Sequence, residues 1–231
     1  MNICCCCFKG KSATEGKNGK NNKSTEKDIE LSSNAVNSMV MCKVGACGKQ
    51  TVVNIDSSTN IIQVSGRGTV LGSCALDCDT AFWQVKVGNN PSVTHSLTHS
   101  LTHSPTHSLT QGVKIGVKRW VAKKPVSCDD ILSGNTTGDE PSWILNNYEL
   151  KTGDVIGVYW DQTDFPILSF TVNSIDIPEA SVHRIRPAID ILPAVSVEKG
   201  SSCEIIFDGN SFTHKPKSNK FKMIVCATSL I

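Results

Sequence analysis

Short apolar runs separated by turn-forming residues fill most of the chain after about residue 39. Residues 81–87 are representative, because Trp83, Val85 and Val87 alternate with the side chains of residues 82, 84 and 86. Alternation with a period of two is typical of a strand with one buried face. Runs of this kind predict strands at residues 51–55, 61–64, 69–71, 81–87, 113–120, 143–146, 154–160, 167–172, 185–191, 204–207 and 221–227. Since no segment keeps a 3.6-residue period for three turns, the pattern predicts an all-β sandwich or barrel.

Two stretches depart from this pattern. Residues 1–38 contain few large apolar residues, and their six lysines outnumber the two glutamates that precede Asp28. This composition predicts a basic, disordered tail ahead of a β domain at residues 39–231.

Residues 91–111 are a low-complexity insertion, in which Thr-His-Ser-Leu recurs between Thr94 and Thr110. The spacing places four histidines on one face if the segment is helical, which would favour a metal site. Ser, Thr and Pro105 disfavour a helix, so we expect a long loop between two strands.

Composition excludes several classes of protein. The 23 basic and 21 acidic side chains give a formal charge of only +2, which argues against a general electrostatic grip on nucleic acid. No apolar run reaches the roughly 18 residues that a transmembrane helix needs. These limits favour a soluble or peripherally attached globular domain, and together with the cysteine usage described next they lead us to expect a cytoplasmic protein with peripheral attachment to a membrane.

The eleven cysteines fall into two groups. Seven are scattered through the β region, and the apolar start of the chain is too short for a signal peptide, so we expect a reducing compartment and mostly free thiols. Cys203 and Cys226 lie in apolar runs and are expected in the core. The pairs Cys42/Cys47 and Cys74/Cys78 have spacings compatible with zinc, but neither forms the tight two-residue knuckle of a structural site.

The other group is Cys4, Cys5, Cys6 and Cys7, which are followed by the lysines of the tail. Because Asn2 stands where N-myristoylation requires glycine, that modification is excluded. Four adjacent cysteines cannot easily surround one metal ion, and a redox role would require a lowered thiol pKa. S-palmitoylation fits best, since acyl chains and a basic segment together supply the two signals that stable membrane attachment takes.

Catalytic motifs are absent from the sequence. The segment 66–72 is glycine-rich but does not match a dinucleotide loop, and there is no Gly-x-Ser-x-Gly elbow. Outside the repeat only His183 and His214 remain, and neither belongs to a nucleophile motif. We expect neither an enzyme nor a cofactor, and no metal site.

Five motifs, two of which consist of two runs each, resemble one known family in their residues and in their order. They are Ala-Phe-Trp-Gln-Val-Lys-Val (81–87), Gly-Val-Lys-Ile-Gly-Val (112–117), Trp-Ile-Leu-Asn-Asn (143–147), Gly-Asp-Val-Ile-Gly-Val-Tyr-Trp-Asp (153–161) with Leu-Ser-Phe-Thr-Val-Asn-Ser (168–174), and the closing runs at 186–188 and 204–207. Over residues 40–215 the chain is similar to SPRY domains, although Ser174 stands where that family usually has glycine. The resemblance implies a bent antiparallel β-sandwich that recognises proteins and has no catalytic activity or cofactor.

Loops at one rim of such a sandwich are expected to bind a protein or peptide partner. Trp120, Gln162, Asp164 and Phe165 are the candidate contact residues, because an aromatic ring beside a polar group is typical of binding hot spots. Packing in the core or at the rim is the alternative for both aromatic residues. Two other functions stay open: a lipid-anchored structural domain without a binding rim, and an enzyme that uses His183 or His214. The sequence does not identify the partner.

Overall fold

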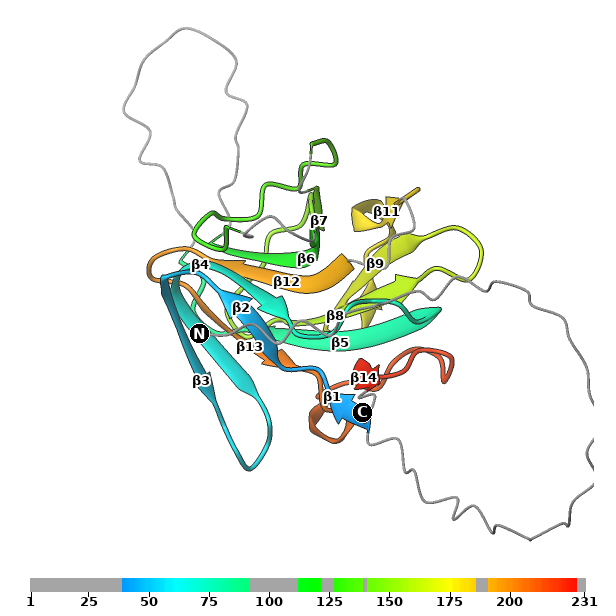
Figure 1. The fold of residues 1–231 in the computed structure, drawn as a ribbon, viewed down its shortest axis with the longest axis horizontal. Coiled ribbons are helices and arrows are strands. Elements are labelled where there is room, and N and C mark those ends of the chain that lie inside the picture. Colours follow the sequence, from blue (N-terminus) through cyan, green and yellow to red (C-terminus); the bar gives the residue numbers. More distant parts are fainter. Residues whose placement is uncertain (1–38, 92–111, 122–126, 139–140, 186–190, 228–231) are drawn as a thin grey trace, which may run out of the picture. The chain divides into compact units, whose positions relative to one another are not determined.

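The computed structural model describes residues 39–91, 112–121, 127–138, 141–185 and 191–227, and these form strands and short 3-10 turns (Figure 1). The chain divides into two units, Met1–Val36 and Asn37–Ile231, and all the described residues belong to the second. Its strands are β1 (Met39–Met41), β2 (Val44–Cys47), β3 (Gln50–Ile55), β4 (Ile62–Gly72), β5 (Thr80–Val87), β6 (Val113–Arg119), β7 (Ser142–Ile144), β8 (Val155–Asp161), β9 (Ile167–Val172), β10 (Ile175–Asp176), β11 (Val182–His183), β12 (Ile191–Val197), β13 (Ser202–Ile206) and β14 (Val225–Ala227).

Two antiparallel sheets share the long strand β4. The first sheet has the order β2–β4–β12–β6–β7, and the second has the order β3–β4–β13–β5–β8–β9, with β10 and β11 both paired to β9. In Figure 1, β6 and β12 lie above β5 and β8. The fold is therefore a bent antiparallel β-sandwich, and the all-β prediction is confirmed.

Glycines allow β4 to pass from one sheet to the other. Gly66 and Gly68 adopt φ values of 94° and 136°, which side chains rarely tolerate. A Cβ on Gly68 would also lie 2.8 Å from the carbonyl oxygen of Cys128. The sequence predicted two strands here, at 61–64 and 69–71, but the structure has one continuous strand that bends between them.

The space between the sheets is filled by alternate side chains. Trp83 on β5 and Phe170 on β9 are 0% and 1% exposed, and they share one buried cluster with Ile115 and Val117 of β6. Burial of such a side chain contributes about 1.5–3 kcal/mol to folding. The inward face that the alternation predicted for Trp83, and the buried position expected for Cys203, are confirmed.

The opposite face of β5 is covered as well, which the alternation did not indicate. We call residues 207–224 the strap. Phe212 of the strap packs on Phe82, and Phe221 on Tyr159, each with ring centroids 4.9 Å apart. Phe82 and Tyr159 themselves lie 4.6 Å apart. Phe82 and Gln84 are each 1% exposed as a result. The predicted strand at 221–227 begins only at Val225, because the earlier residues belong to the strap.

A strand was predicted at 185–191, but residues 186–190 lie outside the described residues. The structure has a strand at Ile191–Val197, which the sequence pattern did not predict and which contains the proline at position 193. Pro193 pairs with Val117 of β6, whereas pairing with β4 starts only at Ala194. The N–H that proline lacks is therefore not needed for hydrogen bonding to β4.

Cysteine chemistry is mixed in the described domain. Cys42, Cys47, Cys78 and Cys203 carry free thiols, as expected for most cysteines, but Cys74 is disulfide-bonded. Burial raises the pKa of Cys203 to about 12. Within the described ranges, no three His, Cys, Asp or Glu side chains are grouped as a metal would require, and no helix is long and apolar enough to cross a membrane. The histidines of the repeat, the acylatable cysteines and Cys226's side chain lie outside what the structure describes.

Candidate protein-binding rim

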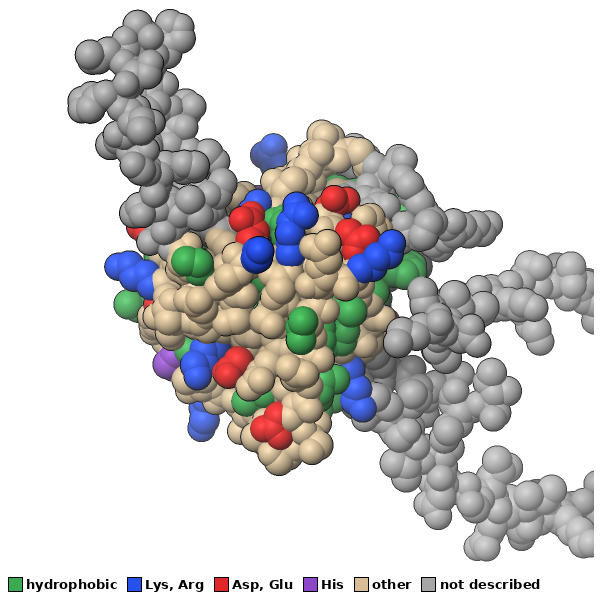
Figure 2. All heavy atoms as spheres, turned by 90° about the vertical axis from the view of Figure 1, so that its left-hand side faces the viewer, with side chains coloured by type: hydrophobic (Ala, Val, Ile, Leu, Met, Phe, Trp, Pro, Cys, Tyr) green, Lys and Arg blue, Asp and Glu red, His purple; other side chains and the backbone are tan. Residues whose placement is uncertain are grey.

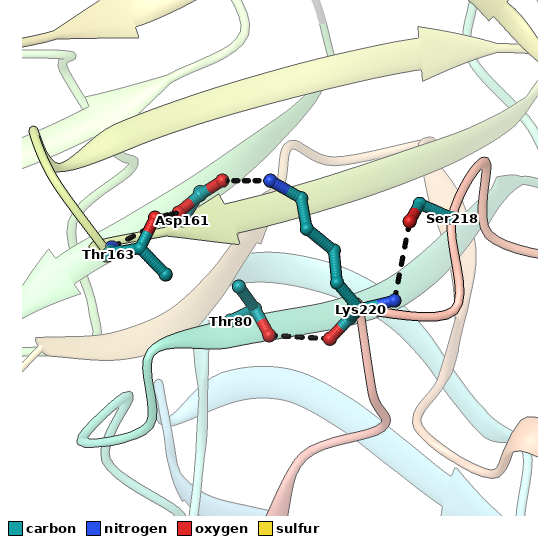
Figure 3. A network of polar contacts seen from close by, with 5 residues as sticks. All are labelled: Thr80, Asp161, Thr163, Ser218 and Lys220. Carbon is teal, nitrogen blue, oxygen red and sulfur yellow. Dashed lines mark hydrogen bonds and ion pairs between the residues drawn. The ribbon is translucent and has the colours of Figure 1, made fainter.

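The segment from the last residue of β8 to the start of β9, which we call loop 161–166, is fixed at its first residue. The carboxylate of Asp161 accepts hydrogen bonds from the backbone N–H and hydroxyl of Thr163, at 3.1 and 2.7 Å. Its other oxygen lies 2.7 Å from Nζ of Lys220, which belongs to the strap (Figure 3). Burial raises the pKa of Asp161, but the hydrogen bonds from Lys220 and Thr163 outweigh it and the pKa is lowered overall. The loop thus begins at a carboxylate that stays charged.

Gln162 ties this loop to the segment that precedes β5. Its backbone N–H donates to the carbonyl oxygen of Asp79 at 2.8 Å, and its side-chain Nε2 donates to that of Cys78 at 2.9 Å. Burial, and then the charges of Asp77 and Asp79, raise the pKa of Cys78. Gln162 therefore positions the loop, and its amide is already used within the domain.

The tip of the loop carries the most exposed large apolar side chain among the described residues. Phe165 is 76% exposed, and Asp164 beside it is also exposed. The next residue, Pro166, is buried, and its carbonyl oxygen accepts a hydrogen bond from the N–H of Ile185 at 3.4 Å. Packing in the core or at the rim was the alternative role for Phe165, but 76% of the residue is exposed to solvent.

Trp120 lies near the same end of the sandwich but in a different setting. It follows β6, is half buried, and packs on a small cluster that includes Leu71, Leu132 and Ala194. Arg119 pairs with Ile191, whose carbonyl oxygen accepts the N–H of Leu76. The segment at residues 73–79 is therefore hydrogen-bonded both to Gln162 and to Ile191, which pairs with the residue before Trp120. We call loop 161–166, segment 73–79 and Trp120 together the rim.

The sequence reasoning missed the partners of this loop. Lys220 lies 59 residues after Asp161, and the carbonyl oxygen of Lys220 also accepts the hydroxyl of Thr80 at 2.6 Å. Neither contact could be predicted from the residues near it in the sequence. A charge count would have singled out the strap, because no acidic residue follows Asp208.

The two histidines considered for catalysis lie on separate elements. His183 is exposed on β11, and His214 is half buried in the strap, where its backbone carbonyl oxygen binds Gln84. Neither imidazole has a hydrogen-bond partner among the described residues.

Charge is mixed on the face drawn in Figure 2, where lysine and arginine side chains are interspersed with acidic ones. This arrangement differs from the basic stripe that proteins use to bind nucleic acid.

Comparisons with known proteins give likenesses of structure alone. No family model matches the chain, and neither does any curated protein. A crystal structure of a human SPRY domain aligns with a TM-score of 0.43 and 13% identity, over 68% of this chain and 96% of that one. The TRIM65 PSpry domain aligns with a TM-score of 0.45 and 10% identity, over 73% and 90%. The NEUZ (NHR) domain of Neuralized from Drosophila melanogaster aligns with a TM-score of 0.42 and 9% identity, over 76% and 96%. Likenesses at this level do not assign a function, which must rest on the site itself.

Proposed function

We propose that this chain is a non-catalytic protein-interaction module of SPRY type, an adaptor or scaffold whose rim binds a protein or peptide partner. The observation that carries the proposal is Phe165, an aromatic side chain 76% exposed on a loop that is held in place at both ends. Aromatic residues dominate binding hot spots, and a loop that is already ordered loses little entropy on binding. Asp164 and Phe165 make the contact, Gln162 positions the loop, and Trp120 borders the surface.

The resemblance of the sequence motifs to SPRY domains supports this proposal. The cysteine-rich N-terminus and the segment from Phe207 to Pro216 are similar to SPRY domain-containing protein 7 in particular. The family implies recognition of proteins without catalysis.

A photo-crosslinking experiment tests the rim directly. Benzoylphenylalanine is introduced in place of Phe165 in cells, and in place of Ile175 as the control. Ile175 is 69% exposed and lies past the opposite end of β9, so it matches Phe165 in exposure but not in position. We expect a defined covalent adduct from position 165 and none from position 175. Equal labelling at the two positions, or none at either, would instead favour a structural domain without a binding rim.

We further propose that S-palmitoylation of Cys4, Cys5, Cys6 and Cys7 tethers the chain to the cytoplasmic face of a membrane, with help from the lysines of the tail. Acyl chains provide the main attachment and the lysines a smaller, salt-dependent part. Replacing the four cysteines by serine should move the protein to the supernatant on cell fractionation. Cys47→Ser is the control, because Cys47 is an exposed free thiol within the β domain and should leave the distribution unchanged.

An enzyme is the remaining alternative. It would require turnover of a substrate by the purified protein and loss of that turnover in His183→Ala or His214→Ala.

A further inference from the structure

The strap concentrates positive charge at the surface of the domain. Lys215, Lys217, Lys220 and Lys222 fall within eight residues, and all four are exposed. No acidic residue occurs between Asp208 and the last residue of the sequence. Of these four lysines the rim uses only Lys220, which pairs with Asp161.

Two parts of the strap are fixed to β5. The first is held by Gln84, which binds the N–H of Thr213 at 2.8 Å and the carbonyl oxygen of His214 at 2.5 Å. The second is held by the N–H of Phe82, which donates to the carbonyl oxygen of Lys222 at 2.8 Å. Residues 82 and 84 are two positions apart on one strand face, a separation of about 7 Å. Lys215 and Lys222 therefore extend from neighbouring, fixed backbones.

The four lysines differ in their partners. Lys217 pairs with Asp176 at 3.0 Å and lies over the ring of Tyr159, and Lys220 pairs with Asp161. Lys215 and Lys222 have no acidic partner among the described residues. Next to Lys222, Met223 is 44% exposed. Unpaired cations beside an exposed apolar side chain are the composition of surfaces that contact anionic lipid.

The strap ends where the chain enters the domain. The carbonyl oxygen of Ile224 accepts the N–H of Cys42 at 3.2 Å, and Val225 of β14 pairs with Met41 of β1. The tail that carries the acylatable thiols is covalently joined just before β1. A tether on that tail would therefore connect to the domain beside Lys222 and Met223.

We propose that the strap is a second membrane contact, in which Lys215, Lys222 and Met223 rest on an anionic lipid surface and orient the domain above it. Its role in cells rests on the proposed tether, but the contact itself is a property of the folded domain. Acidic headgroups neutralise the two lysines while the thioether enters the interface between headgroups and acyl chains.

The test uses the purified full chain with Cys4–Cys7 changed to serine, so that no acyl group contributes. Binding is measured by co-sedimentation with vesicles of about three parts phosphatidylserine to seven parts phosphatidylcholine, and with phosphatidylcholine alone. Lys215→Gln/Lys222→Gln should weaken binding to the anionic vesicles by about fivefold to thirtyfold. Adding Met223→Gln should weaken it further.

The matched control is Lys151→Gln/Lys199→Gln, which removes the same charge from exposed positions away from the strap. Its affinity should fall by less than about twofold, since these charges lie outside the proposed contact. An equal loss in the two double variants would show that only net charge matters, and would overturn the proposal. Loss of duplex oligonucleotide binding with unchanged vesicle binding would also overturn it, in favour of nucleic acid. Neither result would bear on the acyl tether, which the cell fractionation tests separately.

Discussion

The side-chain amide of Gln84 donates from Nε2 to the carbonyl oxygen of His214 at 2.5 Å, across 130 residues of sequence. Its Oε1 also accepts the N–H of Thr213 at 2.8 Å, so one buried side chain satisfies two backbone groups of the strap. Gln84 is a buried polar residue whose side-chain amide is hydrogen-bonded on both its nitrogen and its oxygen. A protein core tolerates a buried polar side chain when its hydrogen bonds are satisfied in this way.

Gln84→Met should destabilise the domain by about 2–3 kcal/mol, because it leaves an N–H and a C=O of the strap without partners. Gln63→Met is the control, since Gln63 is exposed on β4, and its effect should stay within about 0.5 kcal/mol. Urea unfolding measures both values. A change below 0.5 kcal/mol for Gln84→Met would show that the strap is not held through this residue.

Trp83→Ala and Phe170→Ala should each cost about 3–5 kcal/mol in the free energy of unfolding, because each leaves a large cavity between the sheets. Both rings belong to the buried cluster between the sheets, which establishes their inward position. Phe165→Ala is the matched aromatic control and should change stability by less than about 0.5 kcal/mol, since its ring is in solvent. Similar losses for all three variants would contradict the division between core and rim.

The repeat provides a prediction that the structure leaves open. Deleting residues 94–110 should change the free energy of unfolding by less than about 2 kcal/mol, because loop length contributes little to stability. The segment lies outside the described residues, but its two described flanks, Pro91 and Gly112, adjoin ordered strands. A larger loss on thermal or chemical unfolding would show that the repeat packs against the domain.

The sequence pattern predicted those strands and turns that depend on residues close together in the sequence. The strand at 167–172 has the predicted bounds, and the turn after it begins at Asn173, because asparagine tolerates positive φ. The structure gives φ values of 50° and 71° at Asn173 and Ser174, so serine takes the position usually held by glycine. A mid-strand glycine at 157 suggested close packing of the facing sheet, but the close neighbour is on the adjacent strand. A Cβ there would lie 2.4 Å from Oγ1 of Thr171 on β9.

Features set by distant contacts were not predictable from local pattern. The alternation placed Phe82 and Gln84 on the solvent-facing side of the strand. Both are buried because Phe212 and Thr213 of the strap, more than 120 positions later, pack on them. The same applies to the candidate site. Phe165 was named from its residue type, but its exposure, and the positioning of Gln162 by Cys78 and Asp79, required the fold.

Acid should weaken the contact between the strap and the rim. The pKa of Asp161 is lowered from its ordinary value of 3.8, so the ionised carboxylate stabilises the fold above that pH. This contribution is lost as pH falls through the lowered pKa of the folded state. Asp161→Asn should therefore reduce stability more at pH 7 than at a pH well below 3.8, where protonation of the wild-type carboxyl removes the ion pair with Lys220. A difference that does not shrink in acid, measured by urea unfolding at both pH values, would contradict the role of the ionised pair.

Binding of a protein partner through the tip of loop 161–166 is most directly tested by quantitative affinity purification from native cells. Wild type, Phe165→Ala and Ile175→Ala are compared, after unfolding measurements show equal stability for all three. We expect a defined subset of co-purifying proteins to fall about tenfold or more with Phe165→Ala, as for an aromatic hot spot worth about 1.4 kcal/mol or more, and to be unchanged with Ile175→Ala. The same proteins recovered at the same level with all three baits would contradict the proposal that this rim is a binding surface.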